Sequence, residues 1–371
     1  MECDIVQGTI KNIFPGGNTS RGFYSFYRYI LGQDEARRII CIKGGPGTGK
    51  SSLMKKIGKY FNEKGYDIEY HHCSSDNNSL DGIVIKGLKV AILDGTSPHV
   101  VDPVNPGAVD EVLNMGDCWN EEGFKKYRHN ILDINKKVGK TFKRAYRFFG
   151  ASKLVYDDWY NYNSEALNLS KLNLLKENLK ESLFTTPPSN IGFDRHLFAT
   201  AFTPNGIITY IENLSSDYKK VYVLKGGPGT GKTNVLEFLS NEALKRGYYV
   251  EIFHTPLIPE KIEHILIPAL NVAILTSNEI NNLDLKGTVI DMRDCLNPHT
   301  LEKNKAEMEY DATEFYALLN KGLATIKEAK GLHDELETFF VPNMDFSKVS
   351  DVVANIIKKI NGYEEDYLNN K

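Results

Sequence analysis

Short apolar runs and amphipathic segments alternate along the chain, and each pattern predicts a different element. Residues 39–43 form an apolar run that leads into a glycine-rich loop, as a buried parallel strand does. Residues 50–61 space their apolar side chains like a helix with one buried face, and residues 67–73 and 88–93 are typical of the next two strands. The predicted order is strand, loop, helix, strand, helix, strand and a helical tail. This order indicates a parallel sheet covered on both faces.

The second half of the chain repeats this order at a constant offset. Residues 43–51 recur as residues 225–233, and residues 88–93 recur as residues 270–275, in both cases 182 residues further on. Chance similarities do not hold register over such a length, so the offset indicates an internal duplication. Looser matches extend outward on both sides: Thr19 and Gly22 with Thr203 and Gly206 (offset 184), and residues 153–158 with residues 330–335 (offset 177).

Each half contains one full GxxxxGK[ST] motif between an apolar run and an amphipathic segment. The first motif comprises Gly44, Gly45, Pro46, Gly47, Thr48, Gly49, Lys50 and Ser51, followed by Ser52; the second comprises Gly226, Gly227, Pro228, Gly229, Thr230, Gly231, Lys232 and Thr233. The glycines let the backbone turn its N–H groups toward phosphate oxygens, and the following helix presents its positive end to the same anion. In such a loop Lys50 or Lys232 reaches the β and γ phosphates. The hydroxyl of Ser51 or Thr233 then ligates Mg²⁺, so we expect two ATP-binding loops with Mg²⁺ as the accompanying ion.

These motifs predict an α/β fold class with two tandem P-loop NTPase domains, each a mainly parallel sheet flanked by helices with a helical C-terminal extension. Residues 108–113 and 288–292 are predicted fourth strands. The linker 185–190 contains two prolines and other turn residues that a helix cannot cross. We therefore expect one domain over residues 1–187 and the other over residues 188–371, with the helical extensions acting as lids or caps.

A P-loop site that transfers a phosphoryl group or hydrolyses ATP needs a carboxylate at the end of a neighbouring strand to hold the hydrated Mg²⁺. Asp94 ends an apolar run and meets this requirement, although Asp-Gly is also a common turn pair. In the second half Thr276 stands at the matching position and carries no charge, and Asp291 can substitute if its strand lies next to the second loop. We expect a catalytically competent first site, and a second site that binds nucleotide but is slow or inert.

No glutamate follows Asp94 directly, where many ATP hydrolases keep the base that activates water. Candidates for that base are Asp76, His99, Asp102 and Glu111, and each is equally interpreted as a polar loop residue in solvent. The second half has no counterpart of the Asp76 carboxylate or the His99 imidazole. We therefore name Asp76 and His99 as catalytic candidates of the first site.

Residues 125–147 carry nine lysines and arginines and a single acid, Asp133. This stretch is interpreted as a basic lid over phosphates, as a patch for an acidic partner, or as a solvated helix face. Arg144 and Arg147 lie three residues apart beside aromatic side chains, which makes them the candidates for an arginine finger or a lid contact.

Composition and net charge bear on the class of partner, the cellular location and the presence of a zinc site. The net charge of −3 gives no indication of a nucleic acid or an anionic membrane as partner, and aromatic platforms for bases are not visible. Five cysteines without a CxxC pair are typical of reduced thiols, and the N-terminus lacks the pattern of a signal peptide, so we expect a cytoplasmic protein. His71 and His72 are neighbours in a predicted strand and point to opposite faces, which argues against a shared zinc ion.

The two GGPGTGK[ST] loops, together with residues 71–76, 94–102, 106–111, 144–147, 195–201 and 203–206, resemble a family of bacterial tandem P-loop ATPases. Members of that family occur mostly in Gram-positive endospore formers and are often labelled ATPase or nucleotide kinase. The resemblance covers nearly the whole chain and implies ATP binding. Thr276 departs from an acidic position, which counts against activity at the second site.

The leading hypothesis is a Mg²⁺-dependent ATPase in which Lys50, Ser51 and Asp94 act as phosphate clamp, metal ligand and metal acid. The second site then binds ATP or ADP and biases the arrangement of the halves. Two alternatives stay open: a P-loop kinase for a nucleotide or small molecule, whose acceptor pocket follows the second strand, and a non-enzymatic nucleotide sensor that acts on a protein partner.

Overall fold

The computed structural model describes residues 6–97 and 100–369. The chain forms two compact units, and each takes segments from both halves of the sequence. Unit 1 comprises residues 1–16, 25–143 and 325–371, and unit 2 comprises residues 17–24 and 144–324. Each unit has a mixed sheet with flanking helices, so the predicted α/β class is confirmed. The compact units do not coincide with the predicted ranges 1–187 and 188–371, because the helical tails cross from one unit to the other.

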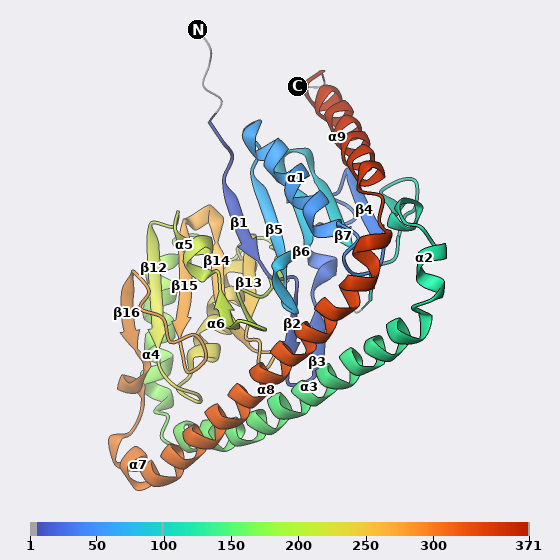
Figure 1. Cartoon of the computed structure of the whole chain (residues 1–371). Coiled ribbons are helices and arrows are strands. Elements are labelled where there is room, and N and C mark those ends of the chain that lie inside the picture. Colours follow the sequence, from blue (N-terminus) through green and yellow to red (C-terminus); the bar gives the residue numbers. More distant parts are fainter. Residues whose placement is uncertain (1–5, 98–99, 370–371) are drawn as a thin grey trace. The chain divides into compact units, whose positions relative to one another are not determined.

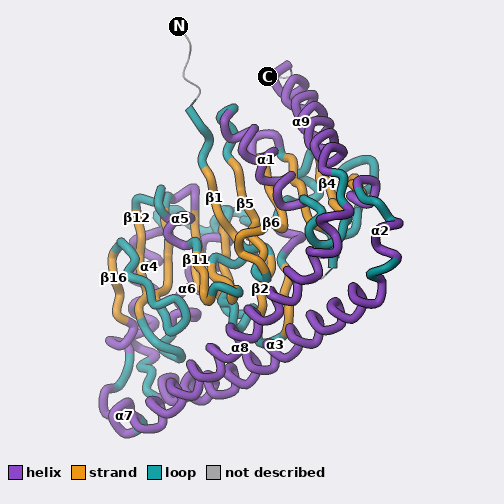
Figure 2. The backbone as a smooth tube through the Cα atoms, viewed as in Figure 1, coloured by secondary structure: helices purple, strands orange, loops and turns teal. Residues whose placement is uncertain are grey.

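The sheet of unit 1, within the described residues, has six strands in the order β1-β5-β6-β7-β4-β8 (Figures 1 and 2). The strands are β1 (Ile10–Ile13), β4 (Arg38–Lys43), β5 (Ile68–Cys73), β6 (Asp76–Ile85), β7 (Val90–Asp94) and β8 (Asp110–Asn114). The helices are α1 (Lys50–Glu63), α2 (Glu122–Lys125), α9 (Phe346–Asn369) and parts of α3 (Arg128–Glu165) and α8 (Lys305–Phe340). Central strand β4 pairs in parallel with β7 on one side and β8 on the other. Because a buried strand must be apolar on both faces, β4 reads as an almost unbroken apolar run.

The sheet of unit 2 has the equivalent order β16-β12-β15-β14-β13-β9 over the part of the chain that is described. Its strands are β9 (Asp194–Leu197), β12 (Lys220–Lys225), β13 (Val250–His254), β14 (Ile262–Ile267), β15 (Val272–Ser277) and β16 (Thr288–Asp291). Its helices are α4 (Leu169–Leu183), α5 (Ile211–Ser215), α6 (Lys232–Leu244), α7 (Pro298–Lys303) and the remaining parts of α3 and α8. Two small sheets accompany it, one of β2 (Gly16–Thr19) with β3 (Gly22–Ser25) and one of β10 (Thr200–Thr203) with β11 (Gly206–Thr209).

One strand in each sheet runs against the predicted parallel order. β6 is antiparallel to β5 and β7, and β14 is antiparallel to β13 and β15, where a helix was expected. Only two residues separate β5 from β6, which allows a hairpin but leaves no room for a crossover helix. The β-branched run Ile83, Val84, Ile85 gives β6 its buried end. The sheets are therefore mixed.

The last helix of each sequence half packs in the other half's unit. In unit 1, α9 lies against α1 (Figure 1) and buries Val349, Val353, Ile356 and Ile360 in the core with Leu53, Ile57 and Phe61. In unit 2, α4 lies against α6 and buries Leu172, Leu179 and Leu183 with Val235, Leu236 and Leu239. Full burial of each such side chain stabilises the fold by about 1.5–3 kcal/mol. The offset of 177 residues relates α4 to α9, so the two tails are equivalent and exchanged.

Backbone hydrogen bonds repeat this exchange at the start of each tail helix. The N–H of Asp345, just before α9, donates to the carbonyl of Cys118 at 2.7 Å. The N–H of Asn168, which caps α4, donates to the carbonyl of Cys295 at 2.8 Å. The Cys118 carbonyl lies in the short turn after β8, and the Cys295 carbonyl lies in the equivalent turn after β16. β8 and β16 are the strands that pair with β4 and β12, which lead into the glycine loops. Each tail is therefore held at its first residue as well as along its apolar face.

Among the described residues, no helix is long and apolar enough to cross a membrane.

Two glycines of α8 provide a matched test of how tightly this helix is packed. A Cβ at Gly322 would lie 2.4 Å from a ring carbon of Phe149, whereas a Cβ at Gly331 meets nothing within 4 Å. We expect Gly322→Ala to destabilise unit 2 by about 1–2 kcal/mol, since overpacking outweighs the gain in helix propensity. Gly331→Ala should instead stabilise unit 1 by about 0.5–1 kcal/mol.

The measurement is urea unfolding followed by the fluorescence of Trp159 for unit 2 and of Trp119 for unit 1. Equal effects of the two substitutions would contradict the described packing of Phe149 against α8.

Candidate functional site

Glycine loop 1 (residues 44–51) connects β4 to α1 in a conformation that only glycine adopts without strain. Gly47 and Gly49 have φ angles of 66° and 85°. Lys50 starts α1, and its Nζ donates to the carbonyls of Gly44 (2.9 Å) and Gly45 (2.7 Å). The Lys50 side chain therefore folds back across the loop, and the N-terminus of α1, with its unpaired N–H groups, opens into the same space.

Asp94 lies at the carboxyl end of β7, directly beside this loop. Its Oδ2 is 3.5 Å from Lys50 Nζ, and both side chains are nearly buried. The N–H of Thr96 donates to Asp94 Oδ1 at 2.9 Å, which fixes the orientation of the carboxylate. Ser51 Oγ accepts the N–H of Leu80 in β6 at 3.0 Å. The structure thus brings together Lys50, Ser51 and Asp94, the three residues that the sequence assigned to one site.

The end of α8 and the residue that follows it cover loop 1; the sequence predicted a helical cap, but not one from the other half of the chain. A Cβ at Gly45 would lie 2.4 Å from the ring of Phe340, and one at Gly47 would lie 2.9 Å from Val341 and 3.3 Å from Glu337. The absence of side chains on these glycines thus serves a second purpose, because it lets the tail approach the loop backbone closely. The cover comes from the second half of the sequence.

The candidate bases of the first site have different surroundings. Asp76 Oδ2 accepts a hydrogen bond from Ser79 and lies 3.5 Å from Lys330 Nζ of α8. Asp102 pairs with Lys43 at 3.0 Å and is mostly exposed. His99 lies outside the described residues.

Glu111 and the two arginine candidates lie on elements that serve other contacts. Glu111, in β8, pairs with Lys359 of α9. Arg144 and Arg147 are exposed on the part of α3 that belongs to unit 2, and neither lines the pocket at the second glycine loop. The guanidinium of Arg144 lies over the ring of Phe148, 5.7 Å from the ring centroid.

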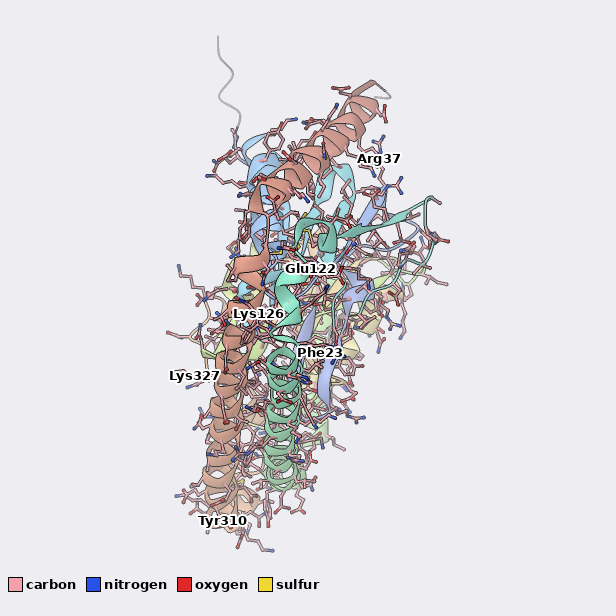
Figure 3. All side chains as sticks on the ribbon, turned by 45° about the vertical axis from the view of Figure 1, so that its right-hand side comes forward. Phe23, Arg37, Glu122, Lys126, Tyr310 and Lys327 are labelled. Atoms are coloured by element: carbon pink, nitrogen blue, oxygen red, sulfur yellow. The ribbon has the colours of Figure 1, made fainter. Side chains whose placement is uncertain are left out.

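The basic stretch around α3 is laid out along exposed helix faces (Figure 3). Lys125 pairs with Glu122 at 2.5 Å, and the ammonium of Lys126 lies 4.6 Å from the centre of the Tyr127 ring. These local contacts are typical of a solvated helix face. The interpretations as a lid or as a patch for an acidic partner stay predictions.

The neighbouring histidines make separate contacts. His71 is fully buried with its Nε2 3.4 Å from Glu69, whereas His72 Nε2 lies 2.8 Å from the side-chain oxygen of Asn12. Burial lowers the pKa of His72 to about 4, so its ring is neutral at physiological pH. Among the described residues, no group of three or more His, Cys, Asp or Glu side chains is arranged to hold a metal ion.

Glycine loop 2 (residues 226–233) repeats the geometry of loop 1 between β12 and α6. Gly229 and Gly231 have φ angles of 72° and 91°. Lys232 Nζ donates to the carbonyls of Gly226 and Gly227, both at 2.5 Å. Burial lowers the pKa of the Lys232 ammonium, partly offset by the nearby charge of Glu279. Loop 2 is likewise covered by a long helix, here α3, because a Cβ at Gly229 would lie 2.2 Å from the backbone oxygen of Tyr160.

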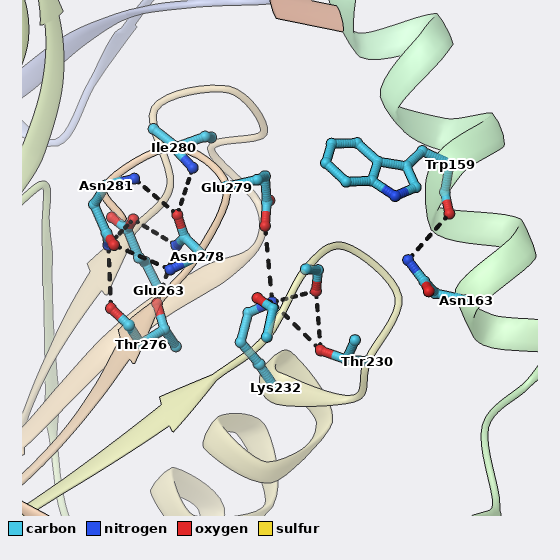
Figure 4. A network of polar contacts seen from close by, with 12 residues as sticks. Trp159, Asn163, Thr230, Lys232, Glu263, Thr276, Asn278, Glu279, Ile280 and Asn281 are labelled. Atoms are coloured by element: carbon cyan, nitrogen blue, oxygen red, sulfur yellow. Dashed lines mark hydrogen bonds and ion pairs between the residues drawn. The ribbon is translucent and has the colours of Figure 1, made fainter. Parts of the chain in front are cut away.

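A pocket opens at loop 2 and gathers charged side chains of both signs. Its walls are residues 229–234 of the loop and of α6, together with Tyr156, Tyr160, Thr255, Lys261, Ile262, Glu263, Thr276, Asn278 and Glu279. Lys261 Nζ lies 4.0 Å from the centre of the Tyr160 ring, and burial lowers the pKa of this lysine. Figure 4 shows Glu279 directed at Lys232, at a distance of 3.9 Å from Nζ. Two lysines beside a glycine loop suit an anion, and two carboxylates add sites for a cation or a proton.

Glu263 is the most strongly perturbed acid of this pocket. Its side chain is buried, and its Oε1 accepts amide hydrogens of Asn278 and Asn281, each at 3.0 Å (Figure 4). Burial raises the pKa of Glu263 to about 7, against the opposing effect of these hydrogen bonds. The group therefore changes protonation near neutral pH, as a proton acceptor or donor in catalysis must.

The two residues that the sequence compared with Asp94 are both engaged elsewhere. Thr276 is buried; its Oγ1 accepts from Asn278 and its N–H donates to His264 Nδ1 at 3.0 Å. β16 does lie next to β12, as the Asp291 hypothesis required, with Asp291 opposite Lys225. However, the Asp291 carboxylate is bound by Arg293 at 2.5–3.0 Å and does not line the pocket.

Sequence reasoning missed Lys261, Glu263 and Glu279 at loop 2, and Lys330 and Glu337 at loop 1. The 182-residue offset matches Glu263 with Asp81, which is also buried, so an acid at this strand position was visible in both repeats. The offset of 177 marked the helix faces that carry Lys330 and Tyr160, but it did not say which loop each face covers.

The raised pKa of Glu263 predicts a pH-dependent loss of stability in unit 2. From pH 5 to 7 the folded state keeps a proton that an unfolded glutamate has already released, so stability falls as pH rises through this window. Glu263→Gln removes this titration. The variant should gain roughly 2–3 kcal/mol relative to the wild type between pH 5 and pH 8, since one pKa unit corresponds to about 1.4 kcal/mol.

The measurement is urea unfolding at both pH values in a Trp119→Phe background, so that Trp159 alone reports on unit 2. His264 and His254, whose pKa values burial lowers to about 3, titrate in both proteins and cancel in the difference. A pH-independent difference between the two proteins would show that Glu263 ionises normally.

Comparison with known proteins adds one local similarity. The family model described as Nephrocystin 3, N-terminal, matches residues 25–86, a stretch that contains β4, loop 1 and α1 but ends before Asp94. No curated protein and no solved structure matches the chain.

Proposed function

We propose that the chain binds ATP at both glycine loops and is a Mg²⁺-dependent ATPase at loop 1. The observation that carries this proposal is the repeated constellation of a lysine and a carboxylate. In each unit the first lysine of the loop helix donates to the carbonyls of the first two loop glycines and faces a carboxylate, at 3.5 Å for Lys50 and 3.9 Å for Lys232. A glycine-rich turn that only connected a strand to a helix would need neither the lysine nor the carboxylate.

The loop conformation favours phosphate as the ligand. Left-handed glycines directly before a helix turn successive N–H groups to one side, and the helix N-terminus adds a partial positive charge there. Lys50 supplies a full positive charge at the same point. A triphosphate carries more negative charge than a carboxylate or a single phosphate, so this arrangement favours a nucleoside triphosphate.

The residues at loop 1 also fit Mg²⁺. This ion uses oxygen ligands, and it commonly takes one or two from the protein and the others from phosphates and water. Ser51 Oγ at the start of α1 and Asp94 Oδ2 beside Lys50 are oxygens of the required kind. Bound there, Mg²⁺ neutralises the charge that develops on the transferred phosphoryl group. Lys50 orients the phosphates, and Thr96 holds the Asp94 carboxylate in position.

Loop 2 is proposed as a second nucleotide site, with Lys232 at the phosphates and Thr233 at the start of α6. The pocket beside it supports this assignment, because Lys261 adds a second ammonium. ATP or ADP bound there can bias loop 1 only if it prefers one of two arrangements of the chain. Localisation in the cytoplasm is part of the same proposal and follows from the expected reduced cysteines.

Phosphate release from ATP and Mg²⁺ tests the proposal when loop 2 is disabled by Lys232→Ala. In that background we expect Lys50→Ala and Asp94→Asn each to lower kcat by about 10²–10³-fold, as the loss of a charge-stabilising group does in other enzymes. Asp34→Asn makes the same chemical change at an exposed position of unit 1 and should leave the rate unchanged.

Nucleotide binding, followed by a fluorescent ATP analogue, is measured on the same samples and on the wild-type chain, in which both loops are intact. Binding at both loops without phosphate release from any variant would overturn the ATPase assignment. Release that appears only after a phosphoryl acceptor is added would identify a kinase, and binding without any turnover would identify a nucleotide sensor.

A further inference from the structure

Loop 2 lacks the aspartate of loop 1, and the residue at that position is committed to structure. Thr276 is buried, and its backbone and hydroxyl are bound by His264, Asn278 and Asn281. Thr276 lines the pocket at loop 2, but its hydroxyl carries no negative charge with which to hold a cation. If loop 2 binds a metal together with its nucleotide, the carboxylate must come from another position.

Glu279 is the residue with the geometry for that role. It follows β15 by two residues, and its Oε2 is 3.9 Å from Lys232 Nζ, close to the 3.5 Å between Asp94 and Lys50. The Glu279 side chain is only 6% exposed. Its Oε2 is buried and has no hydrogen-bond partner at standard distance and angle among the described residues, although the Glu279 carboxylate lies close enough to the Tyr156 hydroxyl to add to the effect of burial in raising the pKa of that tyrosine. A buried carboxylate oxygen in this state is directed into the pocket without a full set of partners, which is costly unless a ligand completes it.

The turn that carries Glu279 is rigid. Asn278 Oδ1 accepts the N–H groups of Ile280 (2.8 Å) and Asn281 (3.0 Å), while Asn281 Oδ1 accepts the N–H of Asn278 at 3.1 Å (Figure 4). The hydroxyl of Tyr316 in α8 donates to the Glu279 carbonyl at 2.9 Å. The backbone that carries the Glu279 side chain is therefore held in place before any ligand binds, as a preorganised site requires.

The other acids of this region do not fit the role. Asp291 is bound by Arg293, and Glu263 keeps its proton up to about pH 7, where its pKa lies. A protonated acid is a poor ligand for a hard cation such as Mg²⁺. Glu263 is therefore suited to carry a proton, and Glu279 is the candidate carboxylate ligand for Mg²⁺ in this pocket.

We infer that Glu279 holds Mg²⁺ at loop 2 together with Thr233, in the place that Asp94 has at loop 1, so that the second site takes a metal–nucleotide complex. This inference rests on the proposed nucleotide binding at loop 2. On this inference the second repeat still has a carboxylate that binds the metal, but this carboxylate lies in the turn after β15 rather than at the position that matches Asp94. The competing explanation is that Glu279 serves only as a counter-ion to Lys232.

Metal-dependent nucleotide binding distinguishes the two explanations. The experiment uses the full chain with Lys50→Ala and Asp94→Asn, so that loop 1 does not contribute. ADP affinity is measured by calorimetry with and without Mn²⁺, and bound Mn²⁺ is counted by electron paramagnetic resonance. We expect one Mn²⁺ per chain in the presence of ADP, and an ADP affinity that Mn²⁺ raises at least tenfold.

Glu279→Gln should abolish the bound Mn²⁺ and its tenfold effect, while metal-free ADP binding stays equal or becomes tighter because a negative charge is removed. Thr233→Ala should weaken Mn²⁺ binding in the same way, which keeps the test decisive if Glu279→Gln does not fold. Asp284→Asn, on the exposed surface of the same loop, is the matched control and should keep both values.

Wild-type Mn²⁺ binding in Glu279→Gln and Thr233→Ala would overturn the inference and leave Glu279 as a counter-ion. Loss of ADP binding at loop 2 in every condition, including the Asp284→Asn control, would instead contradict the proposed function. The two failures therefore have different signatures.

Discussion

The packing of a second apolar helix beside each glycine-loop helix, on the same face of the sheet, is the contact on which the rest of the structure depends. α1 and α6 pack on one face of their sheets, and a second helix beside each of them completes the apolar core, whereas Lys55, Lys56 and Lys59 on the outer face of α1 stay exposed. The chain supplies α9 for α1 and α4 for α6, each from the opposite sequence half. The same tails bring α8 and α3 across the two loops, so the core and the candidate sites are built by one exchange.

The sequence predicted the repeated core well because its signals are local. Apolar runs identified β4, β7, β12 and β15, and the glycine motifs located both loops to the residue. The antiparallel strands β6 and β14 were missed because a short apolar run between two strands does not reveal its direction. The destination of the tails was missed for a different reason. The apolar stripes of α4 and α9 are similar, and so are the faces of α1 and α6, so the pattern fits either pairing and only tertiary packing decides.

The residues of the candidate sites also differ in whether local sequence signals could predict them. Lys50, Ser51 and Asp94 were predictable because motif spacing and strand ends determine their positions. Glu279 was not, since it sits in a turn whose path depends on side-chain hydrogen bonds of Asn278 and Asn281. Register alone compared Thr276 with Asp94 and suggested a weakened second site. The inference drawn for Glu279 is that a neighbour three residues away takes the place of an acid that one repeat lacks.

The exchange of tails also sets the order in which the molecule can fold while it is being synthesised. Unit 2 has all of its residues once position 324 has been made, whereas unit 1 lacks α9 until the ribosome has added residues 325–371. Domains usually fold in the order in which they emerge, the N-terminal one first. Here most of unit 1 emerges first, but its core is completed last, because α9 is synthesised after the whole of unit 2. Until then the apolar cluster of α1 and its sheet, which includes Ile40, Ile42 and Ile92, lacks the side chains of α9, and incompletely buried surface of this kind makes a nascent chain prone to aggregation.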